Sequence, residues 1–165
     1  MDEKTILNVV IAGIQKNDKW LFIKRARGDY QQKWALVGGK MCFNEEIKSA
    51  AIREIREETG LEVKWLGVKA VLNEILRDKE TGEKLKHFLI ILCHTSVEGG
   101  RLKETKEGQL GWFSENEIEK KTEDIIPSDF FMFKNLLKGG NIRNIVEIEM
   151  LQERENLEIG YLKQY

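Results

Sequence analysis

Three acidic residues near the end of one predicted helix have the spacing of a metal site. Glu54, Glu57 and Glu58 are spaced i, i+3 and i+4, so their side chains are neighbours on a helix. Two carboxylates roughly 5 Å apart repel by about 3 kcal/mol at an effective dielectric constant near 20, and the negative end of the helix dipole adds to this. A divalent cation would neutralise the cluster, and oxygen ligands favour Mg2+ or Mn2+ over zinc. A solvated acidic helix end is the alternative.

The helix that carries these acids is expected to begin at Asn44, whose side chain can cap it, with two acids in its first turn. Gly60 is expected to end it in the left-handed conformation. Arg53 and Arg56 are expected to point away from the acids and to screen them only partly. At 100° per residue, the acids fall on the same stripe as a set of core-facing apolar residues, Ile47, Ala50, Ala51 and Ile55.

The stretch from residue 39 to residue 61 resembles the Nudix box, G-x5-E-x7-R-E-U-x-E-E-x-G-U, in which U is an aliphatic residue. Every fixed position of this pattern is filled, by Gly39, Glu45, Arg53, Glu54, Ile55, Glu57, Glu58, Gly60 and Leu61. So many specified positions in so short a stretch make a specific signal. The sequence is therefore identified as a member of the Nudix (MutT-like) hydrolase family.

The resemblance implies a set of metal ligands. They would be the Gly39 carbonyl oxygen and the side chains of Glu54, Glu57, Glu58 and an acid from a later loop, for which Glu107 is preferred to Glu104. The ion would be Mg2+, with Mn2+ as a substitute. It would neutralise phosphate oxygens and lower the pKa of a bound water.

The resemblance also implies catalytic and phosphate-binding residues. Glu54 is the expected general base, with Glu58 or the later loop acid as alternatives. Arg53 would orient the catalytic acid, and Glu45 would support Arg53 or the loop of the box. The phosphates would be bound by two cationic side chains, Arg25 and Lys40.

The substrate implied is a nucleoside diphosphate linked to some group X. The run WFSENEI followed by IIPSDFFMF is similar to the oxidised-purine nucleoside triphosphatase type of the family, in which acids beside a proline read the base. Ser128 and Asp129 occupy those positions, although Ser128 replaces an acid and both residues also suit a simple helix start after Pro127. The expected reaction converts a nucleoside triphosphate, oxidised or not, to the monophosphate and pyrophosphate. A pyrophosphatase for ADP-ribose or a nucleotide sugar is the alternative, and a non-catalytic nucleotide-sensing Nudix module is the alternative of another class.

The remaining elements must position these residues. Alternation and β-branched content predict strands at residues 6–14, 20–24, 34–37, 61–76, 85–95 and 109–113. Ser114 and Glu117 form a predicted capping box, a charged loop is expected over 97–108, and a helix is expected over 127–138, ended by the glycines at 139–140. A C-terminal hairpin over about residues 141–163 would lengthen the sheet or form a dimer edge. The resemblance implies an α/β (α+β) Nudix fold, with a mixed β-sheet sandwiched between helices.

Length and composition limit the remaining possibilities. The 165 residues are expected to form a single Nudix hydrolase domain, 1–165. A net charge of −1 and the lack of a long apolar run argue against nucleic-acid and membrane partners. Two cysteines, Cys42 and Cys93, fit free thiols in a reducing compartment. The expectation is a cytoplasmic protein, monomer or homodimer, whose partner is a small-molecule nucleotide.

Overall fold

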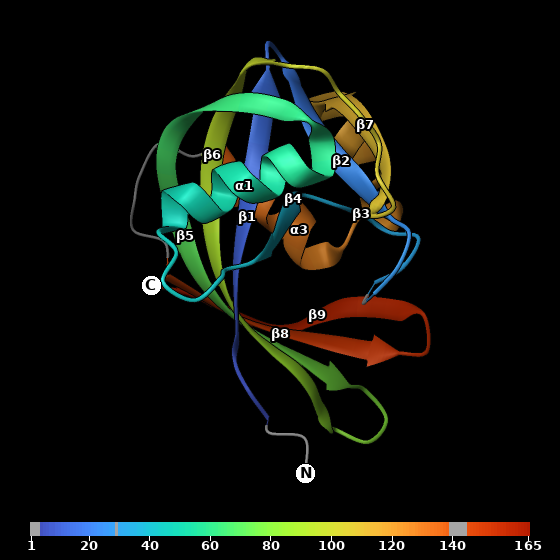
Figure 1. Ribbon diagram of the computed structural model, residues 1–165. Coiled ribbons are helices and arrows are strands. Elements are labelled where there is room, and N and C mark those ends of the chain that lie inside the picture. Colours follow the sequence, from blue (N-terminus) through green and yellow to red (C-terminus); the bar gives the residue numbers. More distant parts are fainter. Residues whose placement is uncertain (1–3, 29, 139–144) are drawn as a thin grey trace.

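One mixed sheet forms the centre of the fold (Figure 1) in the computed structural model, which describes residues 4–28, 30–138 and 145–165. The strands follow one another across the sheet in the order β3 (Trp34–Ala35), β2 (Lys19–Arg25), β1 (Leu7–Lys16), β6 (Lys84–Gly100), β5 (Leu61–Asp78), β8 (Ile145–Glu153) and β9 (Asn156–Gln164). Two further strands complete it, β4 (Val37–Lys40) on β1 and β7 (Gly108–Ser114) on β2.

The helices pack on this sheet through their apolar faces. Helix α1 (Ile47–Thr59) contacts β1, β4 and β5, whereas α3 (Pro127–Phe131) contacts β9 and the π-helical turn that follows it (Met132–Leu137) contacts β5. The core is built from side chains such as Phe22, Leu72 and Phe133, each at most 1% exposed. This mixed α+β architecture is the fold class that the sequence predicts.

The start of α1 differs from the prediction and its end agrees with it. The expected Asn44 cap is wrong, because Asn44 has a φ of 62° in the preceding loop and Glu46 is the N-cap residue, without a side-chain cap hydrogen bond. The first turn also contains no acid. Gly60 ends the helix with a φ of 73°, and its N–H donates to the Arg56 carbonyl oxygen at 3.0 Å. Ala50, Ala51 and Ile55 of the apolar stripe are buried, but Ile47 is exposed.

The ends of several other helices and strands differ from the predicted ones. Strand β6 runs to Gly100, beyond its predicted end, so the charged loop before β7 is shorter than expected. The helix predicted over 127–138 consists of α3 and the π-helical turn, and the glycines at 139–140 lie outside the described residues. The Ser114–Glu117 capping box is confirmed at the start of α2 (Glu115–Lys120). A single 3-10 turn (Thr122–Asp124) follows α2.

The C-terminal hairpin lengthens the sheet. Strand β8 pairs in parallel with β5 from Val71 to Asp78, and β9 pairs antiparallel with β8. The first predicted residues of the hairpin, 141–144, lie outside the described residues. Strand β5 thus has neighbours on both sides over its second half. In the described part of the chain, no helix has the length and apolar character needed to cross a membrane.

Strand β1 has two different antiparallel partners along its length. Residues Val9 to Ala12 pair with β4, whereas Gln15 and Lys16 pair with β2. Strands β2 and β4 therefore leave β1 at different points. Side chains from all three strands line a pocket at this divergence.

Candidate active site

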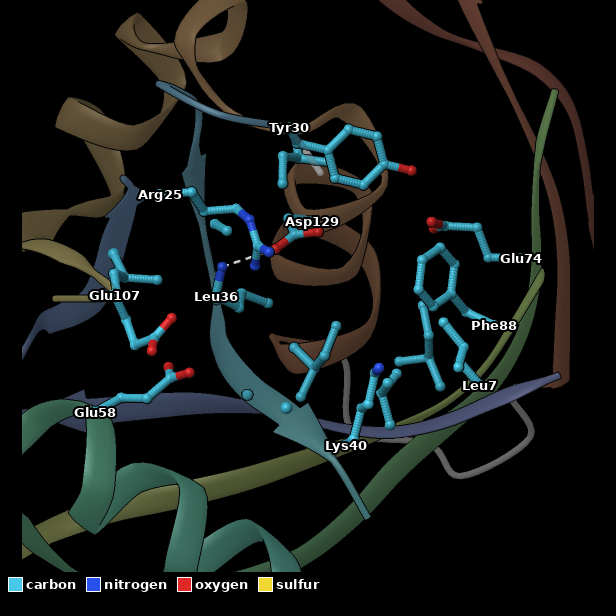
Figure 2. Close-up of a pocket in the computed structure, with 18 of the residues that line it drawn as sticks. Leu7, Arg25, Tyr30, Leu36, Lys40, Glu58, Glu74, Phe88, Glu107 and Asp129 are labelled. Carbon is cyan, nitrogen blue, oxygen red and sulfur yellow. Dashed lines mark hydrogen bonds between the residues drawn. The ribbon is translucent and has the colours of Figure 1, made fainter. Parts of the chain in front are cut away.

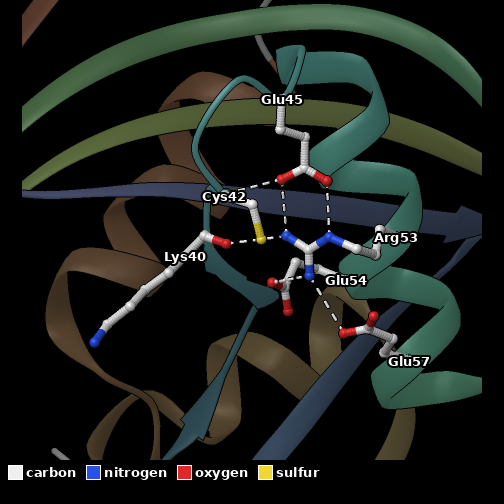
Figure 3. A network of polar contacts seen from close by, with 6 residues as sticks. All are labelled: Lys40, Cys42, Glu45, Arg53, Glu54 and Glu57. Atoms are coloured by element: carbon white, nitrogen blue, oxygen red, sulfur yellow. Dashed lines mark hydrogen bonds and ion pairs between the residues drawn. The ribbon is translucent and has the colours of Figure 1, made fainter.

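A polar network centred on one arginine joins helix α1 to the preceding loop (Figure 3). The Arg53 guanidinium donates to both carboxylate oxygens of Glu45, at 2.7 and 2.9 Å, and to Glu54 at 2.6 Å. It also donates to Glu57 at 3.3 Å and to the Lys40 carbonyl oxygen at 3.0 Å. A single cation thus connects the loop and two of the acids on the helix.

The network corrects the expectation that Arg53 points away from the acids. A helical wheel gives the direction of Cβ only, and the long side chain of Arg53 turns back onto Glu54 and Glu57. Arg56, by contrast, is exposed as expected. The hydrogen bonds from Arg53, together with one from the Cys42 backbone N–H at 2.9 Å, lower the pKa of Glu45 to about 2. Glu45 is therefore ionised at neutral pH and anchors both the arginine and the loop.

The glycine at the start of the box gives the acids close access to the backbone. A Cβ atom at Gly39 would overlap the Glu54 carboxylate, so only glycine leaves room for this contact. Glu58 lies one turn beyond Glu54 and hydrogen-bonds the Gly38 backbone. Burial raises the pKa of Glu58 to about 7, and the charges of Glu54 and Glu107 contribute to the rise. Two helical acids and a loop acid therefore repel one another at the end of α1.

A pocket of about 300 Å3 extends from this point, a size at the lower end for small-molecule sites. Figure 2 shows Glu58 and Glu107 on one side of the pocket and Glu74 and Phe88 on the other. Six of the residues singled out from the sequence line it: Arg25, Gly39, Lys40, Glu58, Glu107 and Asp129. Glu45, Arg53, Glu54, Glu57 and Ser128 are not among the lining residues. Of these, Glu54 lies against Gly39, which does line the pocket.

The two candidate loop acids have different surroundings. Glu107 lines the pocket and forms an ion pair with Arg27, whose Nε donates to Glu107 Oε2 at 3.2 Å. Glu104 instead accepts a hydrogen bond from the Leu110 backbone N–H at 2.9 Å and stabilises the loop before β7. The geometry thus brings Glu107, rather than Glu104, towards Glu58.

The far end of the pocket contains two buried acids, one of which was missed from the sequence. Asp129 is 5% exposed and its Oδ2 accepts a hydrogen bond from the Leu36 N–H at 2.7 Å. Glu74, on β5, is 2% exposed. Burial raises the pKa of each to about 7, and the charge of Glu74 adds to the rise at Asp129. A signal for Glu74 was present, since it occupies an inward-facing position between the buried Leu72 and Leu76.

Comparison with known proteins agrees with this fold. The model of the NUDIX domain matches residues 4–132. A Bacillus subtilis protein described as the uncharacterized Nudix hydrolase YvcI is 28% identical over 148 residues, which are 86% of this chain and 89% of the relative. The ADP-ribose pyrophosphatase of Methanocaldococcus jannaschii is 33% identical over 127 residues, 74% of this chain and 71% of the relative.

Among solved structures, a Mutator MutT protein from Bacillus halodurans superposes with a TM-score of 0.77. It is 22% identical and the match covers 96% of this chain and 97% of that one, so it supports the fold alone. Together with the box and the sheet, the family match defines the class: the chain belongs to the NUDIX domain family. It is a Nudix pyrophosphohydrolase that acts on nucleoside diphosphate derivatives.

Nudix hydrolases generally use divalent metal cations, and the donors here suit such an ion. They are all oxygen atoms. Burial is the main cause of the raised pKa of Glu58, and repulsion from Glu54 and Glu107, which a bound cation would relieve, adds to it. Within residues 4–28, 30–138 and 145–165, no three His, Cys, Asp or Glu side chains already form a group that could hold a metal ion. Arg53 instead binds Glu54 and Glu57 in this arrangement.

Proposed function

We propose that this enzyme is a Mg2+-dependent pyrophosphohydrolase that converts a nucleoside triphosphate to the monophosphate and pyrophosphate. The observation that carries the proposal is the polarity of one pocket. Two acids, Glu58 and Glu107, line one side, beside α1, and two buried carboxyl groups, Glu74 and Asp129, line the pocket together with apolar side chains. The cationic side chains of Arg25 and Lys40 line it as well. A triphosphate needs charge neutralisation at one end, and a nucleobase needs hydrogen bonds between apolar walls at the other.

Mg2+ would be held by Glu54, Glu57, Glu58 and Glu107 with the Gly39 carbonyl oxygen, and Mn2+ would substitute for it. When bound, the ion neutralises phosphate charge and makes water a better nucleophile. Arg53 is proposed to orient Glu54 through the hydrogen bond at 2.6 Å, and Glu45 to fix Arg53 through the bidentate contact.

Glu54 is the proposed general base, with Glu58 as the rival for that role. Glu58 is supported by a pKa of about 7, because a base that titrates near neutral pH both accepts and releases a proton readily. Glu54 is supported by its orientation, since Arg53 holds its carboxylate against Gly39.

Two cationic side chains are proposed to bind the phosphates. Arg25 and Lys40 both line the pocket, one from β2 and one from the end of β4. The Arg25 charge lowers the pKa of both Glu58 and Asp129, so it acts on both ends of the pocket. A substrate phosphate between Arg25 and Lys40 would lie close to the acids of α1.

The base is proposed to bind beside Asp129. Its Oδ2 accepts a hydrogen bond from the Leu36 N–H, which holds the carboxyl group in place, and the side chain lines the pocket. Ser128 is equally buried but is absent from the pocket lining, so its proposed role is indirect. Asp129 would discriminate among bases by accepting or donating a hydrogen bond.

A pyrophosphatase for ADP-ribose is the second candidate, because the relative from Methanocaldococcus jannaschii carries that name and covers most of the chain. One panel assay separates the candidates. The products formed with Mg2+ would be separated by chromatography for dNTPs, oxidised dNTPs, ADP-ribose and nucleotide sugars, so that pyrophosphate from a triphosphate and AMP from ADP-ribose are both detected. Cleavage of a triphosphate with release of pyrophosphate supports the proposal, whereas inert triphosphates together with cleaved ADP-ribose reject it.

The metal assignment has its own control. Glu57→Gln removes a proposed ligand but keeps the size of the side chain, so it should abolish most activity at every Mg2+ concentration that supports the wild type. Arg56→Gln changes an exposed neighbour on the same turn and should leave activity intact. Full activity of the Glu57→Gln enzyme would refute the assignment.

A further inference from the structure

Glu74 is an acid that the chemistry at α1 does not use. It lies on β5, is 2% exposed, and lines the pocket opposite Glu58 and Glu107 (Figure 2). Its Oε2 atom has no hydrogen-bond partner within the part of the chain that the structure describes. A buried polar atom without a partner costs about 1–3 kcal/mol, so its retention calls for a ligand or another compensating role.

The surroundings of Glu74 suit a flat heterocycle. Phe88 and Leu7, from the two strands β6 and β1, line the same end of the pocket, and Figure 2 shows both beside the Glu74 side chain. Tyr30 lines the pocket as well. Aromatic and aliphatic side chains of this kind stack on the faces of a base, while buried carboxyl groups reach its edge.

The hydrogen-bonding capacity of Glu74 also suits the edge of a base. Burial raises the pKa of Glu74 to about 7, an effect that hydrogen bonds with Ser128 and Tyr30 offset only in part. A carboxyl group that titrates near neutral pH presents either a donor or an acceptor, and base edges offer both kinds of partner.

We propose that Glu74 determines specificity by hydrogen-bonding the nucleobase of the substrate through Oε2. This inference rests on the proposed function, which places the phosphates at the opposite end of the pocket. Asp129 comes from α3 and Glu74 from β5, so the two acids approach a base from different elements. The base is thereby read at two points along its edge.

The rival explanation is that Glu74 only fastens β5 to α3 through Ser128. The two explanations differ in their dependence on the base. The test uses ribose 5-triphosphate, which carries the phosphates and the sugar without a base, beside the nucleoside triphosphate that the wild type cleaves best. Values of kcat/KM are measured for both compounds with the wild type, Glu74→Leu and Glu74→Gln.

Glu74→Leu is expected to lower kcat/KM for the nucleotide about ten- to a hundredfold, the size of a lost buried hydrogen bond, and to leave that for ribose 5-triphosphate unchanged. Glu74→Gln retains a donor and an acceptor of similar shape, so it is expected to stay active but to change the ranking of the bases. Glu62→Leu and Glu62→Gln, at an exposed position of the same strand, are the matched controls and should change neither value.

Equal losses for both compounds in the Glu74→Leu enzyme, or no loss for either, would overturn the inference. If Glu74→Leu does not fold, an unchanged ranking of bases in Glu74→Gln overturns it instead. If the wild type cleaves no triphosphate, the proposed function fails separately. The inference is then tested by calorimetric binding of nucleoside monophosphates against ribose 5-phosphate, and a Glu74→Gln enzyme with the wild-type preference would contradict it.

Discussion

The Arg53 network beside α1 and the far end of the pocket treat their acids in opposite ways. In the network, Arg53 provides a counter-charge, and the pKa of Glu45 falls to about 2. Glu58 hydrogen-bonds the Gly38 backbone instead, and burial raises its pKa to about 7. At the far end, Glu74 and Asp129 are buried, and the pKa of each rises to about 7. An acid paired with an arginine keeps its charge, whereas a buried acid without a counter-charge readily takes up a proton and can then donate a hydrogen bond to a neutral group.

The largest expected effect tests the arginine. Arg53→Met should lower kcat/KM by about a hundredfold or more, because Glu54 and the loop at Glu45 lose the group that positions them. Arg56→Met, which removes an exposed arginine from the same helix, is the matched control. Steady-state kinetics on both variants, with thermal unfolding to verify the fold, makes the measurement. Equal activity of the two variants would mean that the network does not position the acids.

A second test concerns the proton at Glu74. Its pKa is raised in the folded state, so the unfolded chain loses this proton first as pH rises. The free energy of unfolding should therefore fall by about 3 kcal/mol between about pH 4.5 and 7, for a pKa shift of this size. Above pH 7 this contribution should no longer change. Glu74→Gln should remove that part of the slope.

Urea unfolding at several pH values measures this slope. Glu62→Gln, on the same strand but exposed, should retain the wild-type slope. Asp129 contributes a slope of the same sign, because burial also raises its pKa. A Glu74→Gln protein with an unchanged slope would show that Glu74 is ionised in the folded state, and the contrast between the Arg53 network and the far end of the pocket would be lost.

The smallest expected effect concerns the loop before β7. Glu107→Gln should lower kcat/KM about tenfold, since the carboxylate faces Glu58 and pairs with Arg27. Glu104→Gln should change little, because an amide oxygen still accepts the hydrogen bond from the Leu110 N–H. Kinetics at saturating Mg2+ compares the two variants. A larger loss in the Glu104 variant would reverse the choice of loop acid.

The acids of α1 were predictable because they are close to one another in the sequence. Glu54, Glu57 and Glu58 are neighbours on any helix, and Gly60 marks the end of that helix. The direction of Arg53 was not predictable, since it depends on a loop in which Asn44 takes a positive φ and brings Glu45 within reach. Local spacing thus identifies the acids but not the contacts that orient them.

The pair of buried acids at the far end of the pocket was harder to predict, because it depends on contacts between segments that are distant in the sequence. Asp129 was selected through its place beside Pro127, but Glu74 comes near it only because β5 and α3 meet in the fold. The strand itself was predicted at residues 61–76, and strict alternation within it could have marked Glu74 as an acid facing the core. What alternation could not supply is the pocket, which forms where β2 and β4 diverge from β1.

The family match ends at residue 132, yet the chain continues into β8 and β9. Ile148 of β8 pairs with Glu74 of β5, so the C-terminal hairpin stabilises the strand that carries this acid. Without β8 and β9, that half of β5 would be an edge strand with unpaired backbone N–H and C=O groups. Substitutions in the β8–β9 hairpin are therefore expected to change the base preference by shifting Glu74, without direct contact between the hairpin and the substrate.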